Sequence, residues 1–277
     1  MTEKCQDNLK NYIKGKDVDK NLIDGRSILG QLAVGLSYLH GKEIIHKDLK
    51  PANILIWVST ELALVKLADF GFSRKLSEGK TSFDATYHLG ARIYRAPEIQ
   101  QTDEEGKAKP SWQSDVWSLG AIFFFVISNG QHAYDVEGIP PEDKSKLIEK
   151  LRQPPNMGCI IDDKNNLYVS DLILCLLKFD PENRPSAHLV VHHPYFTSHN
   201  ETTVLYWAWR ATQFFETSSA KHSKDLLTRP KLMQWCKEYG KSPLTDKQRN
   251  EIEEFCSRYL KKVREFTVIR VILNKPY

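Results

Sequence analysis

The pattern of apolar and polar residues predicts an amphipathic helix in the first part of the chain. Its apolar positions recur close to every 3.6 residues, as on the buried face of a helix: Ile28, Leu29, Leu32, Leu36 and Leu39. Ser27 is expected to cap this helix, because a serine side chain accepts a hydrogen bond from an amide of the first turn. Gly41 is expected to end it. We interpret the helix as part of the hydrophobic core.

Shorter patterns lie on both sides of this helix. Residues 9–13 have apolar side chains at helical spacing, and Gly15 follows them as a helix breaker. Residues 54–58 and 63–67 are short apolar runs separated by polar residues, which predicts the two strands of a β-hairpin. A hairpin therefore follows the first long helix.

The rest of the chain predicts further helices. Residues 115–128 are apolar nearly all round, which is typical of a buried helix. Helices are also predicted over 144–152 and 170–179, and in the tail over 226–239 and 245–263. The chain is therefore expected to be mainly α, in an α+β fold with short β-hairpins.

Polar side chains are concentrated between the first long helix and the hairpin, in His46-Lys47-Asp48-Leu49-Lys50-Pro51-Ala52-Asn53. Polar groups on a loop between two apolar elements are typical of a site that carries chemistry. Asp69-Phe70-Gly71 supplies another carboxylate just after the hairpin. Carboxylate and carbonyl oxygens are the protein ligands that Mg²⁺ prefers. The two stretches together indicate a site for a metal and a phosphate.

Composition and charge limit the classes of protein. The 277 residues are 41% hydrophobic, enough for one large or two modest domains. The five cysteines include no C-x-x-C pair, which favours reduced thiols over a disulfide framework or a metal site. No secretory signal opens the chain, and the apolar run 121–127 is far shorter than the roughly 20 residues of a membrane helix. We expect a cytoplasmic protein with no membrane partner.

The last part of the chain differs in charge from the rest. Residues 197–277 contain 15 Lys and Arg against 9 Asp and Glu, a net charge of +6, whereas the first 196 residues carry −2. Five aromatic residues lie within 204–215: Tyr206, Trp207, Trp209, Phe214 and Phe215. Basic residues with interleaved aromatics bind RNA in some proteins, but more often they pack a helix face onto a neighbouring domain. We expect a protein partner for this tail and no nucleic-acid partner.

Five motifs in a fixed order resemble those of protein kinases. The two polar stretches are followed by Ala96-Pro97-Glu98, Ser114-Asp115-Val116-Trp117-Ser118-Leu119-Gly120 and Asp180-Pro181-Glu182-Asn183-Arg184-Pro185-Ser186. Residues 1–196 thus resemble the large, C-terminal lobe of a Ser/Thr kinase, followed by a helical extension over 197–277. The sequences of residues 46–56 and 126–132 are similar to those of the kinase–endoribonuclease sensors of endoplasmic-reticulum stress. The tail lacks their basic ribonuclease motif, so RNA cleavage is not predicted.

The resemblance implies transfer of phosphate from ATP, with Mg²⁺, to Ser or Thr hydroxyls of a protein substrate. It implies that Asp48 accepts the proton of the attacking hydroxyl and that Lys50 contacts the γ-phosphate. Asn53 and Asp69 are the implied metal ligands. Leu55 is implied to lie beneath the adenine, although a leucine here is equally expected in a simple hydrophobic core.

The same resemblance implies two supporting contacts inside the lobe. Asp115 is expected to hold the backbone of the stretch that carries Asp48. Glu98 and Arg184 are expected to form a buried ion pair, which their isolated positions in the sequence do not indicate.

The chain departs from the kinase pattern in three places. No glycine-rich loop, strand lysine or partner glutamate precedes residue 27, so the small N-terminal lobe is expected to be absent. Lys47 replaces the usual arginine, and a lysine cannot grip a phosphate bidentately. Ala91 replaces the usual threonine, which normally touches the catalytic acid and lysine. We therefore expect weak or no transfer by this chain alone, and the alternative is a pseudokinase-like scaffold that binds partners.

Overall fold

The computed structural model describes residues 5, 7–15, 23–59, 63–75, 85–86, 92–101, 107–140, 142–160, 167–196 and 247. The chain divides into two compact units, Met1–Val191 and His192–Tyr277. The aromatic segment 204–215 and the helices predicted over 226–239 and 245–263 lie outside the described residues, apart from Lys247. The boundary expected at residue 196 stays a prediction.

Helix α2 (Gly25–Gly41) is the first long helix and ends at the expected glycine. Its N-cap is Asp24 and not Ser27, so the predicted cap was wrong. The Asp24 carboxylate accepts the amide of Ser27 at 3.0 Å and its hydroxyl at 2.5 Å. Both residue types cap helices, and the extended backbone of Asp24 decides between them. The predicted apolar face is buried throughout.

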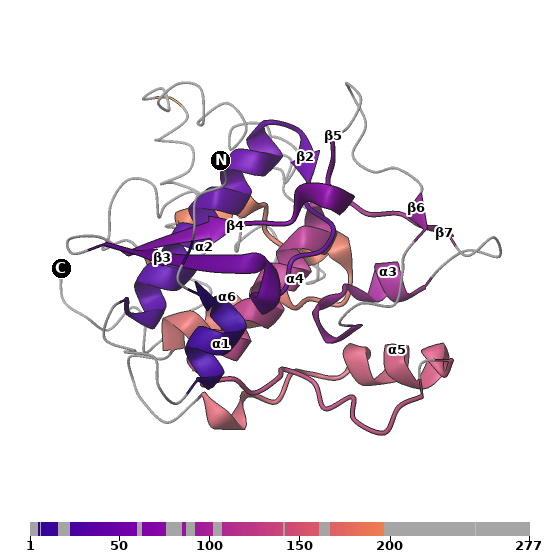
Figure 1. Ribbon diagram of the computed structural model, residues 1–277. Helices are drawn as coiled ribbons and strands as arrows, with labels where there is room; N and C mark the ends of the chain where they lie inside the picture. Colours follow the sequence, from indigo (N-terminus) through magenta and orange to yellow (C-terminus); the bar gives the residue numbers. More distant parts are fainter. Residues whose placement is uncertain are drawn as a thin grey trace. The chain divides into compact units, whose positions relative to one another are not determined.

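The short helix α1 (Leu9–Lys14) ends at Gly15, as predicted, and its three apolar residues are buried. Just before it, strand β1 (Asp7–Asn8) pairs antiparallel with β3 (Ile54–Val58), which pairs in turn with β4 (Ala63–Leu67). The strands β3 and β4 have the bounds that the sequence predicts (Figure 1). The register sets Ile54 opposite Leu67, which brings the segments before β3 and after β4 together.

Two further sheets have strands of two residues each. Strand β2 (Ile44–Ile45) pairs antiparallel with β5 (Arg74–Lys75), and β6 (Ala85–Thr86) pairs with β7 (Lys107–Ala108). The first of these pairs joins the chain just before His46 to the chain just after Phe72. Both polar stretches are therefore bounded by the β2–β5 pair on one side and by the β3–β4 hairpin on the other.

Helix α4 (Trp112–Ile127) is buried nearly all round, as predicted, but begins three residues earlier than expected. Ser111 caps it, and the side chains of Ser111 and Ser114 each accept the other residue's amide. This reciprocal cap fixes the start of the helix. The helix packs against α2 and against α6 (Leu167–Leu176), so it forms the centre of the hydrophobic core (Figure 1).

The remaining described elements are short helices and 3₁₀ turns. They are η1 (Pro51–Asn53), η2 (Phe70–Phe72), η3 (Arg92–Tyr94), α3 (Pro97–Gln100), α5 (Lys144–Arg152), η4 (Met157–Cys159), η6 (Pro181–Asn183) and α7 (Ala187–Val191). Helix α5 has the predicted bounds, and α6 begins three residues before the predicted start. Among the described residues, no helix has the length and apolar character needed to cross a membrane.

Gly120 allows the close approach of α4 and α6. A Cβ at this position would lie 2.7 Å from Cβ of Leu176, too close for either backbone to stay in place. We expect Gly120→Ala to lower the free energy of unfolding by about 1–3 kcal/mol, because overpacking forces the helices apart. Urea denaturation measures this loss.

Gly41→Ala is the matched control for this prediction. Gly41 also lies in a helix, but a Cβ there meets nothing within 4 Å. This substitution is expected to leave stability unchanged or to raise it slightly. Equal stabilities for the two variants would contradict the close packing of α4 and α6.

Candidate active site

The side chains of Asp48, Lys50 and Asn53 meet at one point. Pro51 begins the turn η1, and the amide of Asn53 donates to the carbonyl of Lys50 at 2.9 Å. Nζ of Lys50 then lies 2.5 Å from Oδ2 of Asp48. Nδ2 of Asn53 donates to the same oxygen at 3.0 Å and to the Asp48 carbonyl at 2.9 Å. The turn thus surrounds one carboxylate with a cation and an amide.

Asp69 follows at the edge of this cluster. The amide of Ala68 donates to the carbonyl of Asn53 at 2.9 Å, and Nε2 of His46 lies 3.0 Å from the carbonyl of Ala68. These bonds continue the β3–β4 register by one residue pair. Asp69 is the next residue, with a left-handed backbone (φ 61°, ψ 66°) and an exposed side chain. The two polar stretches therefore adjoin, as the sequence analysis expected.

Asp115 on α4 holds the backbone that leads into Asp48. Asp115 is 1% exposed, and its carboxylate accepts the amides of His46 and Lys47 at 2.8 and 2.9 Å. Nε2 of His40 lies 3.1 Å from the same group. Lys47 has φ of 74°, an unfavourable conformation for a lysine. The hydrogen bonds from the His46 and Lys47 amides to Asp115 hold the backbone in this conformation. The expected role of Asp115 is confirmed.

The Lys47 side chain lies in a partly desolvated and positively charged setting. Burial and the neighbouring Arg74 lower the pKa of its amine, and the Asp115 carboxylate raises it. A second basic group therefore lies close to the residue that replaces the arginine usual in kinases.

Leu55 on β3 and Phe70 on η2 are apolar residues close in sequence to the polar cluster. Leu55 is half-buried in β3, opposite Asn8 on one side and Lys66 on the other. Its place beneath an adenine stays a prediction. The ring of Phe70 lies 5.2 Å from that of His46 and is 47% exposed.

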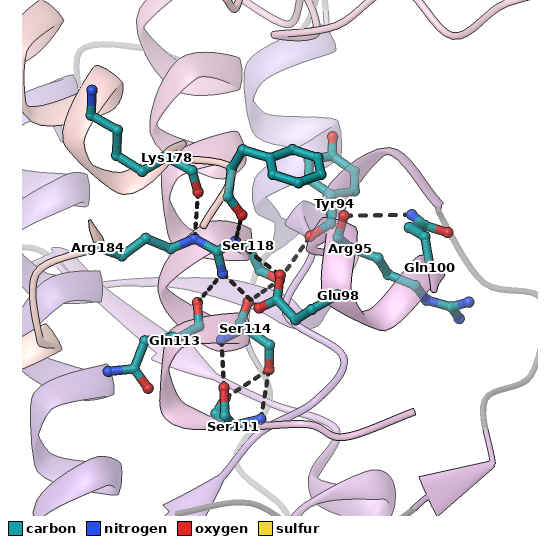
Figure 2. Close-up of polar contacts among 11 residues, drawn as sticks. Tyr94, Arg95, Glu98, Gln100, Ser111, Gln113, Ser114, Ser118, Lys178 and Arg184 are labelled. Carbon is teal, nitrogen blue, oxygen red and sulfur yellow. Dashed lines mark hydrogen bonds and ion pairs between the residues drawn. The ribbon is translucent and has the colours of Figure 1, made fainter. Parts of the chain in front are cut away.

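Arg184 joins α3, the start of α4 and the segment after α6 through several hydrogen bonds (Figure 2). Its side chain is fully buried and binds both carboxylate oxygens of Glu98, at 2.7 and 2.8 Å. It also donates to the carbonyls of Gln113, Lys178 and Phe179 at 2.7–2.9 Å. The expected ion pair between Glu98 and Arg184 is confirmed.

Comparison with known proteins agrees with this geometry. The sequence pattern of the protein kinase domain matches residues 1–196. The chain belongs to the protein kinase family. The kinase fold with helices and small sheets is thereby confirmed, whereas the absent small lobe and the helical extension stay predictions.

Several curated proteins are similar to this kinase chain. The serine/threonine-protein kinase/endoribonuclease IRE2 of Homo sapiens is 32% identical over 200 residues, which are 71% of this chain and 21% of that protein. The sensor for unfolded proteins in the ER ire1 of Schizosaccharomyces pombe is 32% identical over 224 residues, 71% of this chain and 20% of that protein. Mitogen-activated protein kinase kinase 3 of Arabidopsis thaliana is 32% identical over 203 residues, 73% and 36% of the two chains. This kinase chain spans about a fifth of the length of the first two relatives.

Two side-chain oxygen groups, the carbonyl of Asn53 and the carboxylate of Asp69, fit a Mg²⁺ ion. The amide nitrogen of Asn53 is directed to Asp48, which leaves its carbonyl oxygen for a cation. The exposed carboxylate of Asp69 supplies a charged oxygen ligand. One carboxylate and one carbonyl, completed by phosphate oxygens, form a donor set typical of Mg²⁺. These two residues would hold the metal, which would offset phosphate charge.

Gly71 leaves room for the Asp69 carboxylate. A Cβ on Gly71 would lie 3.3 Å from Oδ1 of Asp69, close enough to displace the carboxylate by a few tenths of an ångström. We expect Gly71→Ala to weaken the binding of ADP in the presence of Mg²⁺ by about tenfold, as for other changes next to a metal ligand. Isothermal titration calorimetry measures this affinity.

Gly158→Ala provides the control for this substitution. Gly158 also lies in a 3₁₀ turn, but a Cβ there would be 3.5 Å from Oδ1 of Asn156, an ordinary contact. Its affinity for ADP should equal that of the wild type. If the Gly71→Ala variant also bound ADP with the affinity of the wild type, this result would contradict the role of Asp69 as a metal ligand.

Several supporting residues could not be identified from the sequence. Asp24 caps α2, Gln100 donates to two backbone carbonyls, and Ser118 donates to the carbonyl of Tyr94. Each contact joins a side chain to a backbone group. Aspartate and serine are both capping residue types, so the sequence could not decide between Asp24 and Ser27. The groups that accept from Gln100 and Ser118 are backbone carbonyls, which have no residue identity, so no pattern of residue types could have indicated those contacts.

Proposed function

We propose that this chain transfers the γ-phosphoryl group of ATP, with Mg²⁺, to Ser or Thr hydroxyls of a protein substrate. The observation that carries the proposal is the Asp48 carboxylate, which lies between the Lys50 amine and the Asn53 amide. This arrangement places a proton acceptor and a cation within hydrogen-bond reach of one another. Phosphoryl transfer depends mainly on such positioning and electrostatic stabilisation.

In the proposed reaction, the substrate hydroxyl attacks the γ-phosphorus and its proton passes to the carboxylate of Asp48. A bond forms between the hydroxyl oxygen and phosphorus, and the bond from phosphorus to the bridging oxygen of ADP breaks. Lys50 stabilises the negative charge on the phosphoryl oxygens during transfer. Asn53 keeps the carboxylate oriented through its two hydrogen bonds. ADP and the phosphorylated protein are the products.

The test is a transfer assay with the 277-residue chain, ATP labelled in the γ-phosphate and myelin basic protein as acceptor. We expect slow transfer that requires Mg²⁺ and stops when EDTA is added. Phosphoamino acid analysis should find the label on serine or threonine. Label on tyrosine would contradict the proposed specificity, which the alanine at position 91 makes worth testing directly.

The outcome also separates catalysis from scaffolding. Binding of ATP and Mg²⁺ without any transfer, even over long incubation, would contradict the enzymatic proposal. It would favour the scaffold hypothesis, in which the exposed Phe70 and Phe72 and the aromatic tail bind partner proteins. Transfer that exceeds a no-enzyme blank supports the enzyme.

A further inference from the structure

The loop after α4 begins with two hydrogen bonds that close the helix. The amide of Gly130, which has φ of 95°, donates to the carbonyl of Phe125 at 2.8 Å. The amide of Asn129 donates to the carbonyl of Val126 at 3.3 Å, and the φ of Asn129 is left-handed at 54°. This pair of bonds is a Schellman motif, which satisfies the last carbonyls of a helix. The motif fixes the path of the loop that carries His132.

The imidazole of His132 packs against two aromatic rings. Its centroid lies 5.7 Å from that of Phe125 on α4, and the two rings are stacked at 29°. It also lies 5.7 Å from the ring of Tyr94, edge to face at 76°. The next residue, Ala133, is buried, and its carbonyl accepts the amide of Asn156 at 2.9 Å. Backbone bonds before and after His132 therefore hold the imidazole against these rings.

Lys14 brings a positive charge from α1 to the same aromatic ring. Its Nζ lies 5.6 Å from the centroid of Phe125, and a cation is attracted to the face of an aromatic ring. The stem of Lys14 lies against the loop, because a Cβ on Gly130 would be 3.2 Å from both Cγ and Cε of the lysine. Lys14 and His132 thus contact one phenyl ring from two different elements.

The surroundings of His132 favour its neutral form. Among the residues that the structure describes, burial lowers the pKa of His132 most, Lys14 and Lys10 of α1 lower it further, and Glu137 of the loop raises it. On η3, burial raises the pKa of the Tyr94 phenol, so this neighbour is uncharged near pH 7. The neighbour on α4 is an uncharged phenyl ring. A proton on His132 would therefore add a third positive charge beside two lysines.

We propose that His132 makes the attachment of α1 to α4 and its following loop sensitive to pH. The neutral imidazole leaves the Lys14 ammonium in place over Phe125. Protonation gives the imidazole a positive charge of its own, which repels Lys14 and competes with it for the phenyl ring. Lys14 is exposed, whereas the loop is held by backbone bonds, so the lysine and α1 give way. Strand β1, which pairs with β3 opposite Leu55, directly precedes α1 and is loosened with it.

The direction of the pKa shift sets the pH range of this effect. A histidine in an unfolded chain has a pKa of about 6.5, and the pKa of His132 in the folded chain is lower. The folded chain therefore binds fewer protons than the opened one, and its stability falls with pH. The contribution of His132 is complete above about pH 6.5 and is lost as the pH falls through the folded-state pKa.

Hydrogen exchange of α1 in the 277-residue chain tests the proposal. Mass spectrometry follows the amides of residues 9–15 at pH 7.5 and 5.5, with correction for the intrinsic exchange rates. Protection should be about two- to fivefold lower at pH 5.5, as expected for one pair of exposed charges. His132→Phe keeps an aromatic ring that cannot be protonated, so its protection should be equal at the two pH values. Equal protection in the wild type, or the same loss in His132→Phe, overturns the proposal.

A second measurement tests the part played by Lys14. Lys14→Met removes the charge and keeps most of the stem, so the pKa of His132, titrated by NMR of labelled histidine side chains, should rise by about 0.3–0.7. Lys42→Met is the matched control, because Nζ of Lys42 lies 5.7 Å from the centroid of the exposed Tyr38 ring, and Lys42 is not among the groups that shift His132. Its His132 should titrate as in the wild type. No rise in Lys14→Met, or an equal rise in both variants, overturns the proposal.

Discussion

Replacing Asp48 by Asn is expected to lower phosphoryl transfer by a factor of about 10²–10⁴, the usual contribution of a general base. Asparagine has the same shape, and its side-chain oxygen can still accept from Lys50 and Asn53. It cannot take up the proton of an attacking hydroxyl. The expected result is a folded chain with normal affinity for ADP and initial rates near the blank of the labelled-ATP assay.

Asp135→Asn is the control for the Asp48 substitution. Asp135 is exposed, and its carboxylate accepts the amide of Glu137 at 3.2 Å, a bond that asparagine can also make. The rate of this variant should equal that of the wild type. If the Asp48→Asn variant retained more than half of the wild-type rate, Asp48 would not be the base.

Replacing Arg184 by Met is expected to lower the free energy of unfolding by about 3–5 kcal/mol, the range for breaking a buried ion pair. Methionine fills part of the volume but donates no hydrogen bond. The Glu98 carboxylate would lose both of its bonds to Arg184, and three backbone carbonyls would lose a donor. The contact of the guanidinium with the Trp117 ring, at 5.0 Å, would also disappear. Urea denaturation measures the loss.

Arg152→Met changes an exposed arginine in the same way and should alter stability by no more than about 0.5 kcal/mol. Arg184→Lys tests the geometry, because a lysine cannot bind both carboxylate oxygens and the three carbonyls at once. The free energy of unfolding of Arg184→Lys should lie between those of the wild type and of Arg184→Met. A loss below about 1 kcal/mol in Arg184→Met would mean that the buried cluster adds little to stability.

The elements of the fold that could be predicted are those in which apolar residues recur over several positions. The apolar face of α2 and the runs of β3 and β4 extend over five or more residues, so their period is visible in the sequence. The other strands of the described residues have two residues each, too few to show any alternation. Several polar residues lie near the start of α2 and of α4. The backbone conformation, which the sequence does not show, decides which of them caps each helix.

The candidate site was predictable to a similar extent. Asp48, Lys50, Asn53 and Asp69 were found because their order and spacing resemble kinase motifs. The buried contacts of Asp115 and Arg184 were expected by resemblance alone, since each joins segments 68–86 residues apart. The sequence contained no signal for the hydrogen bonds of Arg92 and Gln100, because their partners are backbone carbonyls.

We propose that the carbonyl oxygen of Asn53 and the carboxylate of Asp69 bind one metal–phosphate group beside Asp48. The most direct measurement is an anomalous difference map of the crystallised 277-residue chain soaked with Mn²⁺ and ADP. We expect an anomalous peak in contact with both side chains and with a phosphate oxygen, and we expect no peak in a crystal of the Asp69→Asn variant. A peak elsewhere, or carboxyl groups of Asp48 and Asp69 on opposite sides of the protein, would contradict it.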